Sequence, residues 1–157
     1  LSVDYRVPRN WRGRFFGMTL PGAWGVNLVG HYGSGLPYTV TDQSGRQEKD
    51  RLNEGRLPAS YTVDMRFNKD VYLGQKNLFF SFFVEVENLF NRRNIINVYT
   101  NTGRPDDDGR IYDLTSDPDG SGPYTAEDVN RYYRLMAKDP QNYSAPRTVR
   151  MGLEFNF

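Results

Sequence analysis

An acidic stretch at residues 117–128 holds candidate metal ligands at regular spacing. Aligned with the twelve positions of a calcium-binding loop, it places Gly122 at the sharp bend and oxygen ligands around it. Those ligands are Asp117, Asp119, Ser121, the carbonyl of Pro123, and Asp128. Against calcium, Asp128 is shorter than the usual glutamate, and no helix precedes the loop. The alternative is a solvated turn in which Thr125 caps a helix over 126–138, with Asp128 at its third position. Ca²⁺ is therefore a candidate cofactor.

Nucleophilic and acid–base catalysis have few candidate residues. His31 is the only histidine, and Ser34 is expected on the opposite strand face, so this spacing gives no nucleophile–base contact. We expect His31 to face a lumen or an interface instead. Glu85 and Glu87 share a face, as paired catalytic carboxylates would, but arginines on the same face are simpler partners for them. The sequence therefore predicts no enzymatic activity.

The charge balance and composition exclude several functional classes. The 157 residues carry 20 Lys and Arg against 19 Asp and Glu, and the basic residues are scattered singly, so we expect no nucleic-acid binding. Cysteine is absent, which excludes disulfides, thiolate catalysis and cysteine-rich metal sites. No apolar run reaches the roughly 18 residues of a transmembrane helix. Aromatic residues nevertheless reach 15%, and the alternating strands of a membrane β-barrel average to a polar composition.

Alternation of apolar and polar residues is the main structural signal. Within 147–157, every second residue from Val149 to Phe157 is apolar, as in a strand with one apolar face. Its length matches the roughly 9 to 11 residues that a tilted strand needs to cross a bilayer. Similar patterns predict strands at 1–7, 24–36, 61–73 and 78 to about 96, with a hairpin turn at 74–77. The sequence thus predicts an all-β fold with about five antiparallel membrane-spanning strands and one short helix in a long loop.

The connections and the two strand faces favour a membrane barrel. Short and long connections alternate, with long loops at about 37–60 and 97–146, as in outer-membrane barrels with short periplasmic turns. Lys69 is the one charged residue on the apolar side, and its cost in lipid predicts a position toward the membrane edge. Charges on the polar side are expected to line a wet lumen and to pair across strands. They are Asp64, Arg66, Glu85, Glu87, Arg150 and Glu154. The alternative is the solvent side of a soluble sheet.

Short motifs follow one another along the chain. They are Gly33-Ser34-Gly35-Leu36-Pro37-Tyr38-Thr39, Asn53-Glu54-Gly55-Arg56-Leu57-Pro58, Val63-Asp64-Met65-Arg66, Val86-Glu87-Asn88-Leu89-Phe90-Asn91, Val98-Tyr99-Thr100-Asn101-Thr102-Gly103-Arg104-Pro105, Ala145-Pro146-Arg147 and the terminal Phe157. This succession resembles the last strands of TonB-dependent outer-membrane receptors over nearly the whole chain. The resemblance implies a 22-stranded barrel with a plug domain inside it, in the outer membrane of a Gram-negative bacterium. It also implies uptake of a scarce ligand, driven by the TonB complex, and a terminal Phe157 that serves as an assembly signal.

The chain itself has about five of those strands and no plug, whereas a closed single-chain barrel needs at least about eight. We therefore expect residues 1–157 to be the carboxyl-terminal segment of a larger receptor, with loops 37–60 and 97–146 extracellular. Its expected partners are outer-membrane lipid, the barrel assembly machinery and, through the missing plug, the TonB complex. The ligand would be a chelate, a glycan or a peptide. The tyrosines expected on the ligand-facing loop are Tyr112, Tyr124, Tyr132, Tyr133 and Tyr143.

Two other functions remain open from the sequence. One is a secreted, calcium-stabilised β-domain used for binding or adhesion, for which the acidic stretch would hold the metal. The other is a passive porin-like channel, which would need no plug. A second acidic run, Asp106-Asp107-Asp108-Gly109, is expected to form a tight exposed turn.

Overall fold

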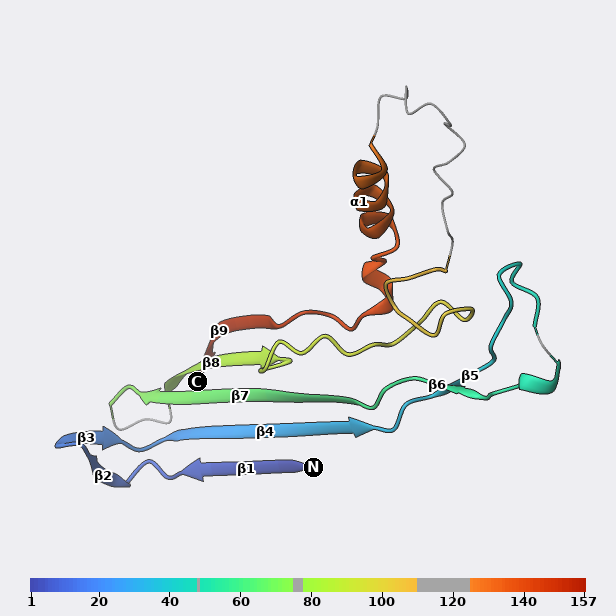
Figure 1. Cartoon of the computed structure of the whole chain (residues 1–157). Coiled ribbons are helices and arrows are strands. Elements are labelled where there is room, and N and C mark those ends of the chain that lie inside the picture. Colours follow the sequence, from blue (N-terminus) through green and yellow to red (C-terminus); the bar gives the residue numbers. More distant parts are fainter. Residues whose placement is uncertain (48, 75–77, 110–124) are drawn as a thin grey trace. The chain divides into compact units, whose positions relative to one another are not determined.

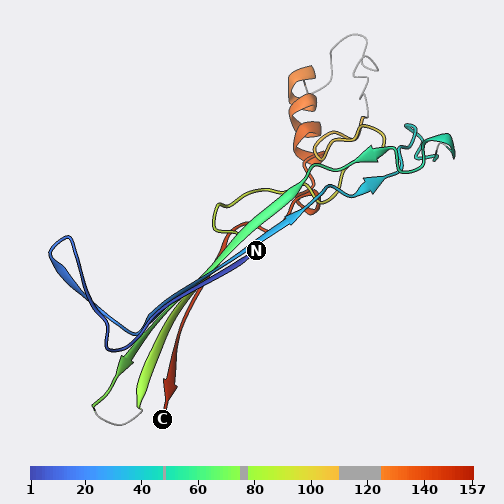
Figure 2. The same ribbon diagram turned by 90° about the horizontal axis from the view of Figure 1, so that it is seen from below.

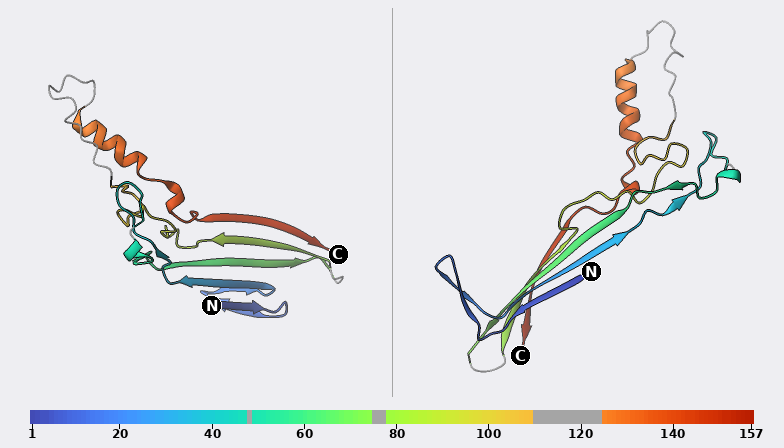
Figure 3. Two further views of the ribbon diagram at one scale, coloured as in Figure 1. Left: turned by 90° about the vertical axis from the view of Figure 1, so that its right-hand side faces the viewer. Right: turned by 60° about the horizontal axis from the view of Figure 1, so that its bottom comes forward.

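Five strands form one antiparallel sheet in the computed structural model, which describes residues 1–47, 49–74, 78–109 and 125–157. They are β1 (Ser2–Val7), β4 (Trp24–Gly33), β7 (Ser60–Tyr72), β8 (Phe79–Glu87) and β9 (Thr148–Asn156). Their order in the sheet is β1-β4-β7-β8-β9, as Figures 1 and 3 show. Each strand therefore pairs with the neighbours that the chain order supplies, which makes the sheet a simple meander. The predicted all-β fold and its five antiparallel strands are confirmed.

The strand register places apolar residues in rows across one face of the sheet. The clearest rows are Met65–Val86–Val149, Phe67–Val84–Met151 and Val71–Phe80–Phe155. Trp24 continues this face onto the first strands, because its ring lies 5.8 Å from Tyr5 and 6.4 Å from Phe67. The face is nevertheless open: Met151 is 70% exposed and Leu153 is 65% exposed.

Lys69 interrupts the apolar face near the end of β7. Its Nζ donates hydrogen bonds to the carbonyl of Gly22 at 2.6 Å and to that of Asp70 at 2.9 Å. The ammonium group therefore bends back to backbone carbonyls at the end of the strand, which lowers the cost of a charge on an apolar face. Lys69 lies three residues before the end of β7 at Tyr72, and its expected place at a membrane edge stays a prediction.

Two strands end earlier than their residue patterns predict. β8 stops at Glu87 instead of continuing to about 96, because Asn88 and Asn91 adopt left-handed backbone conformations with φ of 53° and 51°. Asparagine tolerates this conformation better than most residues, and it turns the chain out of the sheet. β4 likewise ends at Gly33, three residues before the predicted end at 36.

The connection between β1 and β4 contains a hairpin that the sequence pattern did not predict. β2 (Arg12–Phe15) pairs with β3 (Met18–Pro21), and Figure 2 shows this hairpin diverging from the sheet. Its two-residue turn has positive φ at both positions, 47° at Phe16 and 78° at Gly17. This is the geometry of a type I′ turn, for which Asn-Gly is the usual sequence. Phenylalanine at the first turn position costs about 1–2 kcal/mol of backbone strain.

The chain divides into two compact units. The first contains the five-stranded sheet and the hairpin, and it comprises Leu1–Tyr32, Tyr61–Arg92 and Ala145–Phe157. The second comprises Gly33–Ser60 and Arg93–Ser144. These ranges nearly coincide with the two predicted long loops, 37–60 and 97–146. Its elements are β5 (Pro37–Tyr38), β6 (Gly55–Arg56), α1 (Ala126–Met136) and the 3₁₀ helices Lys49–Arg51 and Pro140–Asn142.

The helix α1 forms where the capping argument predicted it. Thr125 accepts a hydrogen bond from the backbone N of Asp128, and the Asp128 side chain accepts one from the backbone N of Thr125. The helix ends at Met136, two residues before the predicted end. Within the described part of the chain, helices fall short of the length and hydrophobicity needed to cross a membrane.

Candidate functional site

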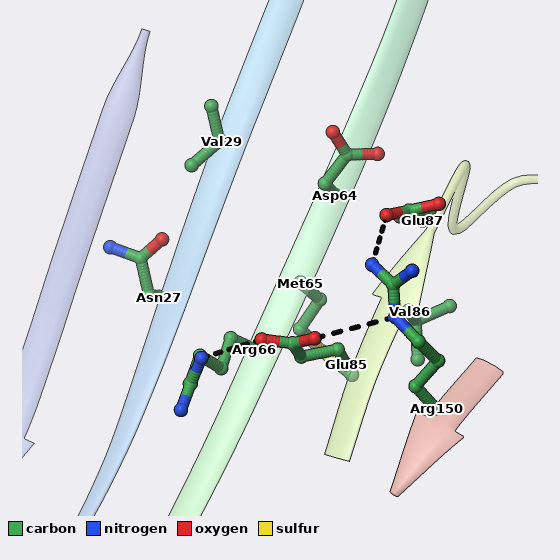
Figure 4. A pocket seen from close by; sticks show the side chains of 9 residues that line it. All are labelled: Asn27, Val29, Asp64, Met65, Arg66, Glu85, Val86, Glu87 and Arg150. Atoms are coloured by element: carbon green, nitrogen blue, oxygen red, sulfur yellow. Dashed lines mark hydrogen bonds and ion pairs between the residues drawn. The ribbon is translucent and has the colours of Figure 1, made fainter. Parts of the chain in front are cut away.

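A ladder of charged side chains crosses the polar face of the sheet (Figure 4). The register places Arg66 of β7 opposite Glu85 of β8, and Glu85 opposite Arg150 of β9. Arg66 Nη1 lies 2.5 Å from Glu85 Oε1, and Arg150 Nε lies 3.6 Å from Glu85 Oε2. The Arg150 guanidinium also donates a hydrogen bond to the carboxylate of Glu87. We call Arg66, Glu85, Glu87 and Arg150 the charge ladder; the structure thus brings together four of the predicted polar-face charges.

Asp64 lies beside the charge ladder but is held by other groups. Its Oδ1 accepts a hydrogen bond from the backbone N of Asn88 at 2.8 Å, and its Oδ2 lies 4.0 Å from Nε2 of His31. His31 therefore sits on the polar face, on the strand next to Asp64. This carboxylate connects β7 to the turn that ends β8, so it has a structural role that the alternation pattern did not reveal.

An open hollow of about 280 Å³ lies over the charge ladder, bounded by four strands. Its walls add Asn27, Val29 and Asp64 to the ladder residues, together with Met65 and Val86 (Figure 4). Two guanidinium groups face three carboxylates in this lining, so it presents hydrogen-bonding groups of both charges. The lining residues include no serine, histidine or lysine. Such a surface suits contact with a polar segment or ligand group better than it suits covalent chemistry.

Glu154, the sixth predicted polar-face charge, lies apart from the ladder. It is opposite Ser81 in the strand register, and it is exposed. Ser81 donates its hydroxyl hydrogen bond to Oδ1 of Asp70 at 2.8 Å. The row Asp70–Ser81–Glu154 therefore contains neutral and acidic groups only, without the alternating charges of the ladder.

Most of the predicted calcium ligands, Asp117, Asp119, Ser121 and Pro123, lie outside the described residues. Asp128 is described, and its carboxylate accepts hydrogen bonds from both the backbone N and the hydroxyl of Thr125, at 3.1 and 2.7 Å. These two hydrogen bonds lower the pKa of Asp128, the side-chain bond being the larger cause. Among the described residues, no group of three or more acidic or histidine side chains is arranged to hold a metal ion. The structure therefore supports the capping role of Asp128.

Three of the five predicted ligand-facing tyrosines lie in the described chain, and their surroundings differ. Tyr112 and Tyr124 lie outside the described residues. Tyr132 is exposed, whereas the Tyr133 hydroxyl donates to the Asp108 carboxylate, and Tyr143 forms a β-bridge with Ile95. Asp108 belongs to the predicted acidic turn, which is thus tied to α1. Tyr133 and Tyr143 are half-buried, and each connects two segments of the second unit that are far apart in the sequence.

Tyr38 organises a cluster that sequence reasoning did not find. A Cβ added at Gly55 would come within 2.4 Å of the Tyr38 ring, and one added at Gly103 would lie 2.5 Å from its hydroxyl oxygen. Tyr38, Gly55 and Gly103 come from three of the motifs that carry the family resemblance. In the sequence, the order of these motifs was the available sign that the three residues matter. The structure adds that the two glycines leave room for the Tyr38 ring.

Asn88 joins the end of β8 to the residues before β9. Its Nδ2 donates to the carbonyls of Arg92 at 2.9 Å and Ala145 at 3.1 Å, and its Oδ1 accepts from the backbone N of Arg92 at 3.0 Å. Nearby, Asn91 Oδ1 accepts from the backbone N of Arg147 at 3.0 Å. Asn88 is 6% exposed, so these hydrogen bonds satisfy a buried amide. The second half of this motif, from Asn88 to Asn91, is therefore a turn whose side chains bind the segment that leads into β9.

Phe157, the predicted assembly signal, extends a row of aromatic rings at the end of β9. Its ring centroid lies 6.0 Å from that of Phe155, which lies 4.9 Å from Phe80. The terminal side chain is exposed on the sheet rim.

No family model, curated protein or solved structure matches this chain. The class of the protein therefore depends on the geometry described above and on the motif resemblance.

Proposed function

We propose that this chain is the carboxyl-terminal part of the membrane barrel of a TonB-dependent outer-membrane receptor, which takes up a scarce chelate, glycan or peptide. The observation that carries the proposal is the open apolar face of the sheet. Soluble monomers rarely expose contiguous apolar patches of more than a few hundred Å². Here apolar residues continue across all five strands, and the exposed members include Val3, Tyr5, Phe82, Met151 and Leu153. Lipid is the environment in which such a face is stable.

The opposite face supports the same proposal. The charge ladder pairs opposite charges between three neighbouring strands, and paired charges are the arrangement expected where a barrel wall meets a wet interior. A sheet with one charged face and one apolar face, interrupted among its rows only at Lys69, has the two surfaces of a barrel wall. In this arrangement the apolar face would lie in lipid, and the hollow over the ladder would face the lumen.

The free edges of the sheet support a wall with more strands. β1 and β9 each have one neighbour in the described sheet, so each presents a row of backbone groups along its outer edge. Backbone groups in lipid must be paired, because no water is present to satisfy them. The proposal therefore requires further strands beside both edges, as in the 22-stranded barrels of the family.

A charged substitution on each face tests the proposal. We expect Met151→Arg, near the middle of β9, to cost about 2–4 kcal/mol in a bilayer and to block stable insertion into outer-membrane vesicles. Glu154→Arg, on the polar face of the same strand, is the matched control and should insert normally. If Met151→Arg folds as well as the control and the protein is stable in buffer without a bilayer mimic, the proposal is wrong and the secreted β-domain is favoured.

Electrical recording separates an energised receptor from a passive channel. A plugged receptor should carry no steady KCl current when the full-length protein is inserted in a planar bilayer. A porin-like channel should give a stable open conductance under the same conditions. An open conductance would overturn the receptor proposal while leaving the membrane barrel intact.

A further inference from the structure

The hairpin between β1 and β4 has an unusual charge composition. Residues 8–23 contain three arginines, Arg9, Arg12 and Arg14, and no acidic residue. Arg9 is engaged at the sheet, where its guanidinium lies 4.1 Å from the centroid of the Tyr72 ring. Arg12 and Arg14 lie on β2 and are exposed. The projecting part of the hairpin therefore carries positive charge and no acidic residue of its own.

The tip of the same hairpin exposes large apolar side chains. Phe16 is 89% exposed and Met18 is 64% exposed. Trp11 covers Gly13, because a Cβ added at Gly13 would come within 2.0 Å of its ring. Apolar tips flanked by arginine and tryptophan are typical of segments that enter the interface of a membrane.

The residue at the turn is not explained by backbone geometry. Phe16 adopts φ of 47°, a conformation that asparagine or glycine would adopt at lower cost. The Phe16 side chain is 89% exposed, so the strained residue presents its ring at the surface. Strain held at an exposed position is a pointer to function.

The base of the hairpin is fixed, so the tip is held out from the sheet. The backbone N atoms of Trp11 and Ala23 donate to the same carbonyl, that of Pro8, at 3.1 and 3.2 Å. A Cβ added at Gly22 would meet that carbonyl oxygen at 2.1 Å, so glycine is required for this close approach. Lys69 Nζ bonds the carbonyl of Gly22 from the neighbouring strand.

We propose that the β2–β3 hairpin is a membrane-surface contact for anionic phospholipid. Arg12 and Arg14 bind the phosphate-bearing headgroups, and Phe16 and Met18 enter the outer part of the acyl region. This kind of membrane binding needs basic side chains that attract anionic headgroups and an apolar tip that enters the acyl region. The hairpin has both. The inference goes beyond the proposed function, since it requires only the hairpin and not a transport activity.

Tryptophan quenching tests this contact directly. The chain has two tryptophans, so Trp24→Phe leaves Trp11 as its reporter, and any tryptophan outside residues 1–157 is replaced by phenylalanine in the full-length protein. We expect brominated acyl chains to quench Trp11 more strongly in vesicles of phosphatidylcholine with phosphatidylglycerol than in phosphatidylcholine alone, and salt to reduce the difference. The double change Arg12→Gln and Arg14→Gln should shift half-maximal quenching to a higher phosphatidylglycerol content, because each arginine strengthens binding about fivefold.

Phe16→Asn separates binding from folding. This variant relieves the strained turn, so it should fold at least as stably as the parent and yet lose most of the quenching. Equal quenching in the two lipid mixtures, or quenching unchanged in Phe16→Asn, would overturn the proposal. A nitroxide spin label attached at Leu153→Cys reports separately whether the apolar face of the sheet lies in lipid. The two proposals can therefore fail independently. If the hairpin binds an acidic protein instead of lipid, quenching will also be equal in the two lipid mixtures, and the lipid proposal will be overturned.

Discussion

Asn88→Ala is expected to be the most destabilising single change in the turn that follows β8. Asn88 makes three side-chain hydrogen bonds, two to Arg92 and one to Ala145. Each contributes about 1 kcal/mol net. Alanine at φ of 53° adds about 1 kcal/mol of backbone strain. The expected loss of unfolding free energy is therefore about 4 kcal/mol.

Two further variants separate these contributions. Asn88→Gly also removes the hydrogen bonds, but glycine adopts the left-handed conformation without strain. Its cost in unfolding free energy should therefore be about 1 kcal/mol smaller than that of Asn88→Ala. Asn53→Ala is the matched control, because Asn53 is exposed and has a similar φ of 56°; only the backbone cost of about 1 kcal/mol is expected there. The assay is equilibrium urea unfolding in lipid vesicles, followed by tryptophan fluorescence. An Asn88→Ala cost below about 1 kcal/mol, or a glycine variant less stable than the alanine variant, would refute this reasoning.

The remaining predictions concern the charge ladder, the helix cap and the second unit. In the ladder, a double-mutant cycle of Glu85→Gln and Arg66→Gln should give a coupling energy of about 0.5–1 kcal/mol that falls with added salt, because both partners are partly exposed; zero coupling at low salt would contradict the pairing. For the helix cap, the pKa of Asp128 is lowered in the folded protein, so its stabilising effect is present above the pKa of the unfolded chain and is lost as pH falls through the lowered value. Circular dichroism should show α1 losing helix content in that acidic range, and the pH dependence should disappear in Asp128→Asn; an unchanged acid transition in that variant would argue against the cap. In the second unit, Gly35→Ala should cost about 1–3 kcal/mol and speed exchange of the Leu57 amide, because the new Cβ would lie 1.4 Å from the Leu57 carbonyl oxygen. Gly30→Ala is its control, since the nearest atom there lies at 3.8 Å, and equal exchange in both variants would refute the steric argument.

The alternation pattern was sufficient to predict the sheet, because a two-residue period has one structural meaning when it continues over nine or more residues. It also placed Arg66, Glu85 and Arg150 on one face, and the register then determined which of them pair. The pattern failed where local backbone geometry overrides periodicity. Leu89 and Phe90 continue an apolar signal, yet the positive φ of Asn88 ends β8 before them.

Features outside the sheet differ in how much of their basis can be read from the sequence. Phe16-Gly17 lacks the usual composition of a two-residue turn, so the β2–β3 hairpin had no clear sequence signal. The packing of Tyr38 against Gly55 and Gly103 is likewise invisible to a local pattern, because it depends on how the second unit folds. The helix cap at Thr125 was predictable, since capping depends on residues three positions apart.

Site-specific labelling along β9 tests the central claim most directly. The chain has no native cysteine, so single cysteines at Met151, Leu153 and Phe155 can be compared with cysteines at Arg150 and Glu154 in membranes. We expect a water-soluble maleimide to label the two polar-face positions and a lipid-soluble quencher to reach the three apolar-face positions, which gives an alternation with a period of two residues. Labelling of both faces by the water-soluble reagent, without alternation, would contradict the assignment of this sheet to the wall of a membrane barrel.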